Sequence, residues 1–332
     1  MKTQIVEINE KSLALAKNVI EGGGLVAFPT ETVYGLGANA FCDDAVKQIY
    51  AVKGRPQDNP LIVHVHKDYD IERLVCDIPS YAKKLAEKFL PGPLTMVYKS
   101  RGAVSPTVSC GLDTLAVRIP SHEGAQRFLK YLDLPIAAPS ANISKHVSPT
   151  SAEHVLADLN GKIPYILDGG ASRGGIESTV LDVTGEKPCI LRSGLITKEM
   201  IAEVAGSCDV FIPKEGVKVR SPGMKYKHYS PNCCTMLFPF DRIEQAKEAY
   251  LSETAKGVNA YIMCDSACAE VLGVKNILCL GKTEEEIAAS LYGKLREGEQ
   301  VAELIIAIAP EKQDGIMAGV MNRLTKACGG KQ

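Results

Sequence analysis

A proline-punctuated stretch in the second half of the chain constrains the fold more than any other feature. Residues 212–233 contain Pro213, Pro222 and Pro231 and show neither the helical period of 3.6 residues nor the strand period of two. The chain has 332 residues, which is too long for one ordinary core. The sequence therefore predicts two domains joined by an extended linker, with the boundaries 1–208, 209–233 and 234–332.

The predicted linker is basic. Five cationic residues are opposed only by Glu215, and they are Lys214, Lys218, Arg220, Lys225 and Lys227. A solvated tether explains this composition, and so does a mobile lid that covers an anionic ligand on the first domain. Both interpretations stay open at this point.

The first domain alternates short β-rich runs with helical patterns, which predicts a mixed α/β fold. Strands are expected at 25–28, 61–65, 95–98, 114–119, 136–138, 165–167 and 179–183, and helices at 43–52, 80–89, 123–131, 152–159 and 198–205. The second domain repeats strand and helix at the spacing of parallel strands with crossover helices, and is expected to be a smaller Rossmann-like domain. Gly281, Lys282 and Thr283 resemble the end of a P-loop, but Asn276 stands where its first glycine belongs, so we interpret them as a helix start.

Composition limits the class of protein. The 38 Lys and Arg nearly balance the 39 Asp and Glu, which excludes a strongly basic nucleic-acid coat protein. No apolar run approaches the roughly 20 residues of a membrane-spanning helix, and the first residues lack a signal-peptide core. The odd count of eleven cysteines favours free thiols in a reducing compartment. We therefore predict a cytoplasmic protein that does not contact membranes.

Four segments that follow predicted strands or helices are rich in small and polar residues. They are 29–37, 53–56, 138–142 and 168–179. Function concentrates in such loops at strand ends. Lys53 and Arg55, with glycine between them, are able to hold a polyphosphate, although cations also cap the C-terminal ends of helices.

Two arginines end apolar strands and are candidate clamps for a carboxylate or a phosphate. These are Arg118 and Arg192, although surface strand ends often carry arginine without a ligand. His64 and His66 share a strand face by the two-residue period. Two histidines are too few for a closed metal site, so a substrate contact or a core imidazole is the better interpretation.

In combination, these motifs resemble the YrdC-like family. The Lys53-Gly54-Arg55 and Ser140-Ala141-Asn142 triplets look like its Lys-x-Arg and Ser-x-Asn signature. The segments 29–37, 59–61, 117–120 and 177–182 fit the same pattern in order and spacing. The end of the linker at 228–231 and the extra domain are similar to the longer, two-domain L-threonylcarbamoyladenylate synthases. The resemblance spans almost the whole chain.

The resemblance implies a twisted, concave mixed sheet and a reaction. L-threonine, bicarbonate or CO2 and ATP would give L-threonylcarbamoyl-AMP and pyrophosphate, a nucleotidyl transfer that begins the threonylcarbamoyladenosine modification of tRNA beside the anticodon. Magnesium is expected with ATP, without side-chain metal ligands and without an organic cofactor. A downstream tRNA threonylcarbamoyl transferase is the implied protein partner, and direct contact with RNA is left open.

The resemblance also implies site residues. Threonine would be held by Thr32, His64, Arg118, Ala138 and Ser178. ATP would be held by Lys53, Arg55, Asn59, Thr114, Ser140, Asn142, Ser148, Arg192 and Tyr229. Lys53 and Arg55 would carry the catalytic charge on the phosphates, and no general base is assigned.

Two other functions compete with this one. The first is a non-catalytic RNA-binding module, which the near-neutral charge and the lack of interleaved basic and aromatic residues disfavour. The second is a related carbamoyl-transfer domain with a different acceptor. A comparison of threonine, serine and no amino acid, with pyrophosphate as the readout, separates the three.

Overall fold

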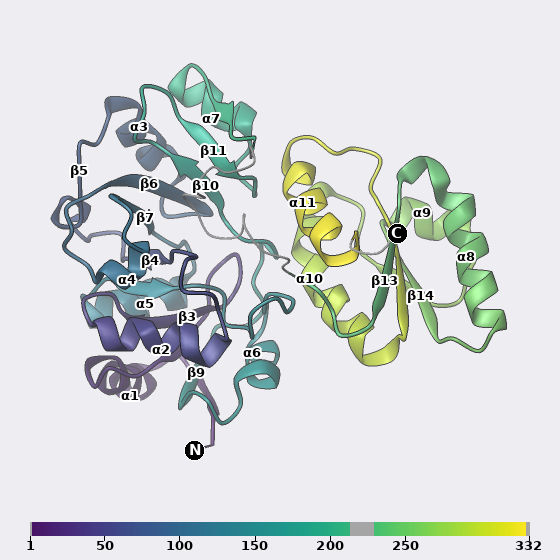
Figure 1. The fold of residues 1–332 in the computed structure, drawn as a ribbon, viewed down its shortest axis with the longest axis horizontal. Helices are drawn as coiled ribbons and strands as arrows, with labels where there is room; N and C mark the ends of the chain where they lie inside the picture. The colour runs from purple at the N-terminus through teal and green to yellow at the C-terminus, as the bar shows by residue number, and fades with distance from the viewer. Residues whose placement is uncertain (1, 213–228, 330–332) are drawn as a thin grey trace. The chain divides into compact units, whose positions relative to one another are not determined.

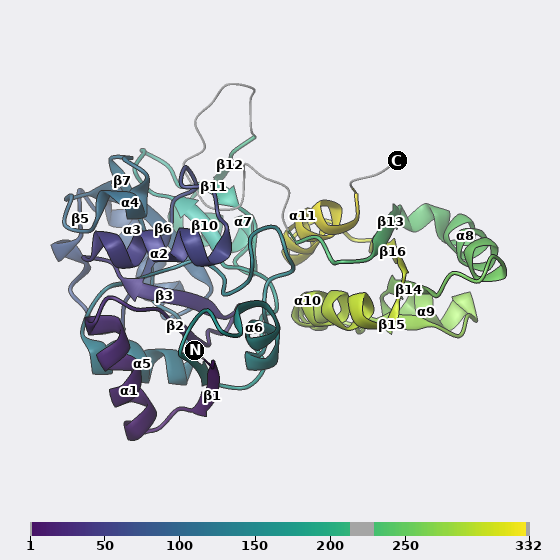
Figure 2. The same cartoon turned by 60° about the horizontal axis from the view of Figure 1, so that its bottom comes forward.

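The computed structural model describes residues 2–212 and 229–329, which form two compact units (Figures 1 and 2). The first unit is built mainly from residues before 213. The second is built from residues after 228 together with two short segments of the first half, Lys145–Ser148 and Gly174–Ile176. Most of the predicted linker, 213–228, lies outside the described residues, and its part as tether or lid stays a prediction.

A mixed sheet is the centre of the first unit. Twelve strands contribute, in the order β1-β9-β2-β3-β8-β4-β7-β6-β10-β11-β12, with β5 paired to β6. Their bounds are β1 Gln4–Glu7, β2 Val26–Phe28, β3 Gly35–Asn39, β4 Ile62–His64, β5 Val75–Cys76, β6 Leu94–Ser100, β7 Thr114–Arg118, β8 Ile136–Ala138, β9 Tyr165–Asp168, β10 Thr179–Asp182, β11 Cys189–Arg192 and β12 Asp209–Val210. The predicted mixed α/β fold is confirmed.

Helices pack against this sheet, most of them where the sequence predicts them, although the four-residue helix at 106–109 is not predicted. They are α1 Glu10–Glu21, α2 Asp43–Lys53, α3 Ser80–Phe89, α4 Pro106–Ser109, α5 Glu123–Leu132, α6 Ala152–Leu159 and α7 Lys198–Ala205, with a short 3-10 turn at Ile71–Arg73. Polar N-caps fix their starts: the side chains of Asn9, Ser151 and Thr197 each accept a hydrogen bond from a backbone N–H of the first turn. The bounds of α3, α6 and α7 match the prediction. Caps and apolar period agree for α6 and α7, whereas α3 begins after Pro79 without a side-chain cap.

β3 was not predicted, because its sequence is rich in small residues and reads as a loop. It pairs antiparallel with both β2 and β8, so it is an interior strand of the sheet. A Cβ on Gly37 would lie 2.8 Å from Ile136 Cγ2, and one on Gly35 would lie 3.1 Å from the ring of Phe28. Glycine is therefore required here for close packing. Because glycine has a low strand propensity, the sequence does not predict this strand.

The second unit contains a smaller, all-parallel sheet. Its order is β13-β16-β14-β15, with bounds β13 Cys234–Phe238, β14 Ala260–Cys264, β15 Ile277–Cys279 and β16 Leu304–Ile308. The helices are α8 Ile243–Ala255, α9 Ser266–Leu272, α10 Glu284–Val301 and α11 Ile316–Cys328, with a 3-10 turn at Phe240–Arg242. Thr283 caps α10 in a capping box with Glu286, which confirms a helix start where a P-loop was considered.

Helix α10 binds the inserted segment Lys145–Ser148. Glu299 accepts from the ring of His146 at 2.9 Å and from the backbone N–H of Asn232 at 3.0 Å. Arg296 donates to the carbonyl of Val147. Because these partners are far apart in sequence, the second unit is assembled from separate stretches of the chain.

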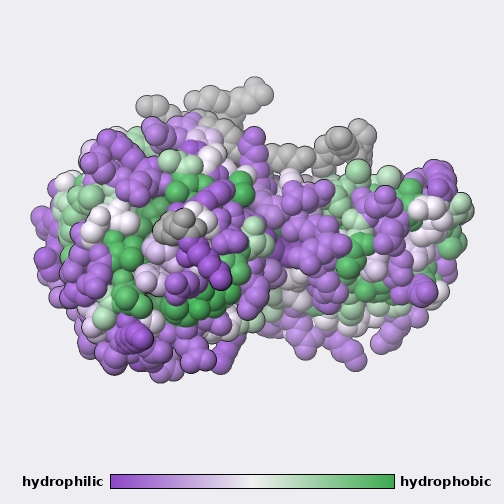
Figure 3. All heavy atoms as spheres, turned by 90° about the horizontal axis from the view of Figure 1, so that it is seen from below, coloured by the Kyte–Doolittle hydropathy of each residue, from purple (hydrophilic) through white to green (hydrophobic). Residues whose placement is uncertain are grey.

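Polar side chains cover much of the face shown in Figure 3, with apolar patches between them. This mixture fits a chain with 45% apolar and 23% charged residues. In the described part of the chain, no helix combines the length and the hydropathy needed to cross a bilayer.

Candidate functional site

Strand register gathers several predicted site residues on one face of the first sheet. His64 pairs with Arg118 across β4 and β7, and Thr95 pairs with Arg118 across β6 and β7. Side chains two residues apart point to the same face, so Thr114 and Ala116 share the face of Arg118. Arg118 and His64, which are predicted to bind threonine, therefore lie side by side at one end of this face.

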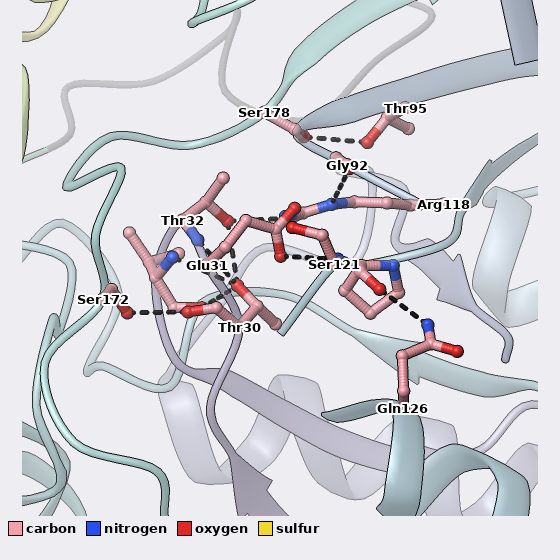
Figure 4. A network of polar contacts seen from close by, with 12 residues as sticks. Thr30, Glu31, Thr32, Gly92, Thr95, Arg118, Ser121, Gln126, Ser172 and Ser178 are labelled. Carbon is pink, nitrogen blue, oxygen red and sulfur yellow. Dashed lines mark hydrogen bonds and ion pairs between the residues drawn. The ribbon is translucent and has the colours of Figure 1, made fainter. Parts of the chain in front are cut away.

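Arg118 is the centre of a buried polar network, shown in Figure 4. Its guanidinium donates from Nη1 to Thr32 Oγ1 at 2.8 Å, from Nη2 to Glu31 Oε1 at 2.7 Å and from Nε to the carbonyl of Gly92 at 3.4 Å. The Arg118 side chain is only 4% exposed. The segment after β2 thus supplies two of the three partners of this guanidinium.

Ser178 connects Arg192 to Thr95, which is the strand partner of Arg118. The Ser178 hydroxyl shares a 2.8 Å hydrogen bond with Thr95 Oγ1, and Thr95 is the strand partner of Arg118 (Figure 4). Arg192 donates from Nε and Nη2 to the carbonyl of Ser178, at 3.2 and 3.1 Å. Ser178, which is predicted to bind threonine, is therefore in direct contact with Arg192, which is predicted to bind ATP.

His64 is a neutral group in this network. Burial and the positive charge of Arg118 lower the pKa of His64 to about 3, so the imidazole carries no charge near pH 7. Its Nδ1 is buried and has no hydrogen-bond partner among the described residues. A buried polar atom of this kind calls for a ligand or a water. His66 lies beyond the end of β4 and pairs with Asp133 instead, so the two histidines do not form one site.

An apolar floor separates Arg118 from Thr114. Ile62, Val97 and Ala116 belong to one small buried cluster on this face. Thr114 begins β7 and Arg118 ends it, which places their Cα atoms about 13 Å apart at 3.3 Å per residue. Ala138, the last residue of β8, pairs with Ile62 beside the same floor. Arg118 and Thr114 therefore lie at opposite ends of this face, with the apolar floor between them.

Lys53 holds the Ser-x-Asn segment. This lysine ends α2, is 2% exposed, and donates to the carbonyls of Ser140, at 2.6 Å, and Asn142. Ser140 Oγ also donates to Asn142 Oδ1 at 2.5 Å. The two halves of the signature are thus one structural unit, in which the ammonium shapes the loop after β8. The expected contact between Lys53 and phosphate stays a prediction.

We expect Lys53→Met to destabilise the fold, because it removes the ammonium and leaves two buried carbonyls unpaired. The loss in the free energy of unfolding should be about 3 kcal/mol, measured by urea denaturation. Lys47→Met is the matched control, because Lys47 lies on the exposed face of the same helix and pairs with Asp43; it should change stability little. A stable Lys53→Met protein would show that the lysine is not structural.

Arg55 and Asn59 form a second group of predicted ATP residues. Arg55 follows Gly54, the left-handed C-cap of α2, and donates to the carbonyls of Asn59 and Pro60 at 3.3 and 3.2 Å. Asn59 is 3% exposed, and its Nδ2 has no partner among the described residues. This orphaned donor, like Nδ1 of His64, is free to bind a ligand.

Two predicted ATP residues belong to the second unit. Ser148 is buried at the end of the segment that α10 binds. Tyr229 is the first described residue after the gap, and its ring lies 5.3 Å from that of Tyr292 in α10. The contribution of Ser148 and Tyr229 to ATP binding stays a prediction.

Two residues of the network, Glu31 and Thr95, are not predicted from the sequence. Glu31 lies inside the polar segment 29–37, where its neighbour Thr32 was singled out, and a single carboxylate in a loop gives no signal of its own. Thr95 joins the network through the pairing of β6 with β7. The sequence alone does not reveal that pairing. Among residues 2–212 and 229–329, no group of three or more His, Cys, Asp or Glu is placed to hold a metal ion.

Two family models together match most of the chain. The model described as "Telomere recombination" matches residues 18–194, and the model described as "Threonylcarbamoyl-AMP synthase, C-terminal domain" matches residues 196–329.

Curated relatives are similar over nearly the full length. The threonylcarbamoyl-AMP synthase of Pyrococcus abyssi is 42% identical over 97% of this chain and 95% of its own. That of Bacillus subtilis is 40% identical over 99% of this chain and 96% of its own. The crystal structure of P. abyssi Sua5 complexed with L-threonine superimposes with a TM-score of 0.91 at 40% identity, covering 98% of each chain.

Proposed function

This chain belongs to the threonylcarbamoyl-AMP synthase family, and from that premise we propose how its residues carry out the reaction. The family resemblance seen in the signature motifs is confirmed. The chain is a nucleotidyltransferase that makes threonylcarbamoyl-AMP from L-threonine, bicarbonate or CO2 and ATP, with release of pyrophosphate.

Threonine is proposed to bind at the Arg118 end of the sheet face. The guanidinium suits the carboxylate, since a planar fork with several N–H donors matches two carboxylate oxygens. Thr32 and Ser178 place hydroxyls beside Arg118 and Thr95, within reach of a small polar side chain. The neutral His64 offers its unpartnered Nδ1 without adding charge. This convergence on one buried arginine is the observation that carries the placement.

ATP is proposed to bind along the other end, toward Thr114, Asn59 and Ser140, with Arg192 linking the two ends through Ser178. The apolar floor of Ile62, Val97 and Ala116 lies between the two ends of the face and offers water no side-chain hydrogen-bonding group there. Water exclusion matters because both the carbamate and the mixed anhydride hydrolyse.

The chemistry needs positioning more than a strong base. The threonine amine adds to CO2 and loses one proton to solvent, which gives a carbamate. A carbamate oxygen then attacks the α-phosphorus, the bond from that phosphorus to the bridging oxygen breaks, and pyrophosphate leaves. Two anions must approach each other, so fixed cations at Arg55 and Arg192 lower the barrier by offsetting their repulsion.

Three further points are proposals that rest on the family. ATP would enter as its magnesium complex, with the ion held by phosphate oxygens and water. The product would pass to a tRNA threonylcarbamoyl transferase for modification of the adenosine beside the anticodon. A cytoplasmic location would follow from that role.

The test is amino-acid-dependent pyrophosphate release. With ATP and bicarbonate, we expect release to require threonine and to fall strongly when threonine is omitted. Replacing threonine with serine reports how tightly the Thr32 and Ser178 end selects its substrate. Equal release without any amino acid would contradict the proposal, and RNA binding with no turnover would favour the non-catalytic alternative.

A further inference from the structure

Glu31 occupies the guanidinium that the substrate carboxylate is proposed to use. Its Oε1 accepts from Arg118 Nη2 at 2.7 Å, and its Oε2 accepts from the backbone N–H of Ser121 at 3.1 Å (Figure 4). The Glu31 side chain is 13% exposed and that of Arg118 is 4% exposed. The pair is therefore nearly buried, and the carboxylate is held at both oxygens.

Among the protein groups bonded to Arg118, Glu31 is the one with the chemistry of the ligand. Thr32 offers a hydroxyl and Gly92 a carbonyl, whereas Glu31 offers a carboxylate like that of an amino acid. A buried arginine without an anion would carry a large desolvation cost. Glu31 removes that cost while the site is empty, and a substrate carboxylate would have to compete with it.

The structure also provides a place for the displaced side chain. Glu31 lines a cavity of about 630 Å³ together with Ser121, His122, Arg127 and Arg173. The cavity wall contains two guanidinium groups and also the carboxylates of Glu123 and Asp168, so a carboxylate that leaves Arg118 stays in a polar environment. Rotation of the Glu31 side chain into this cavity would release the guanidinium of Arg118.

We propose that Glu31 is an internal carboxylate that occupies Arg118 in the free enzyme and is displaced by the carboxylate of threonine. This inference rests on the proposed placement of threonine at Arg118. Glu31 then sets the affinity for threonine, because only molecules with a free Arg118 bind it. If about one molecule in ten has Arg118 free, the apparent affinity is about tenfold weaker than the intrinsic affinity. A ligand without a carboxylate has no means to displace Glu31.

The experiment compares threonine with threoninamide on the full-length protein, by calorimetry and by steady-state kinetics. In the wild type, threonine should bind more tightly than its amide. Glu31→Gln keeps the size of the side chain but removes its charge, so it should lower the dissociation constant and KM for threonine about tenfold. KM for ATP should stay unchanged. Glu123→Gln is the matched control, since Glu123 lines the same cavity at the start of α5 and has no bond to Arg118; it should bind threonine like the wild type.

The outcomes separate this inference from the placement on which it rests. If the wild type binds threonine and threoninamide equally, the placement of the carboxylate at Arg118 is wrong and the inference falls with it. If the wild type discriminates but Glu31→Gln binds threonine equally or more weakly, the placement stands and Glu31 instead positions Arg118. Should Glu31→Gln fold poorly, Glu31→Asp retains the charge with a shorter reach. The shorter carboxylate should hold Arg118 less well, so the Glu31→Asp protein should bind threonine more tightly than the wild type. Unchanged or weaker threonine binding again overturns the inference.

Discussion

Replacing Arg118 with alanine is expected to raise KM for threonine by about a hundredfold or more, with a much smaller change in KM for ATP. A bidentate, charge-assisted pair in a buried site is worth several kcal/mol, and each 1.4 kcal/mol is a factor of ten in affinity. The effect should be confined to threonine because Thr114 and Asn59, the proposed ATP residues, lie toward the other end of β7. Steady-state pyrophosphate release at varied threonine and varied ATP measures both constants.

The Arg118→Ala protein must also be shown to fold, because the substitution leaves the buried carboxylate of Glu31 without its partner. The double variant Arg118→Ala with Glu31→Gln removes that unpaired charge. It should recover stability but not threonine affinity. Lys130→Ala is the control for loss of a positive charge in the same unit, since this lysine is exposed and pairs with Asp68 at 2.9 Å. Equal increases in both Michaelis constants would contradict the assignment of Arg118 as a carboxylate clamp.

The second large effect is expected from Arg55→Ala, which should lower kcat for pyrophosphate release by about a thousandfold. Arg55 is anchored to the carbonyls of Asn59 and Pro60, and a cation held in this way stabilises developing phosphate charge without reorganising. Single-turnover pyrophosphate release with saturating ATP separates this catalytic loss from weaker binding.

A matched control for Arg55 is available elsewhere in the same unit. Arg101 also donates to backbone carbonyls, those of Glu72 and Val75, but on the strand edge around β5. Arg101→Ala therefore tests the loss of an arginine that braces a loop, and it should retain nearly full activity. Wild-type release by Arg55→Ala would remove Arg55 from the mechanism.

Most secondary structure of this chain could be predicted from sequence, because period and caps agree. The helix Lys198–Ala205 has a Thr197 N-cap and a left-handed Gly206 after its end, and the prediction gives its bounds. β3 could not be predicted, because its glycines lie so close to Phe28 and Ile136 that a Cβ would crowd them. Such a requirement exists only after the strands have assembled.

The candidate site shows the same limit. Residue types and motif order point to Arg118, Thr32 and Ser178, but not to what each contacts. Glu31 and Thr95 enter through strand pairing and a loop that crosses to β7, which are tertiary facts. Lys53 illustrates the opposite case: the motif was found, yet burial and carbonyl contacts indicate a loop-shaping function that the sequence did not suggest.

The second unit is assembled from separate stretches of the chain, and this affects what truncation of the protein would remove. A fragment beginning at residue 229 would retain helix α10 but lose the peptide 145–148, which pairs with Glu299 and Arg296. Conversely, a fragment ending near residue 212 would keep that peptide without its helix. Cleavage between the two stretches would therefore separate this peptide from the helix that binds it, and each fragment would lose contacts that the intact chain makes.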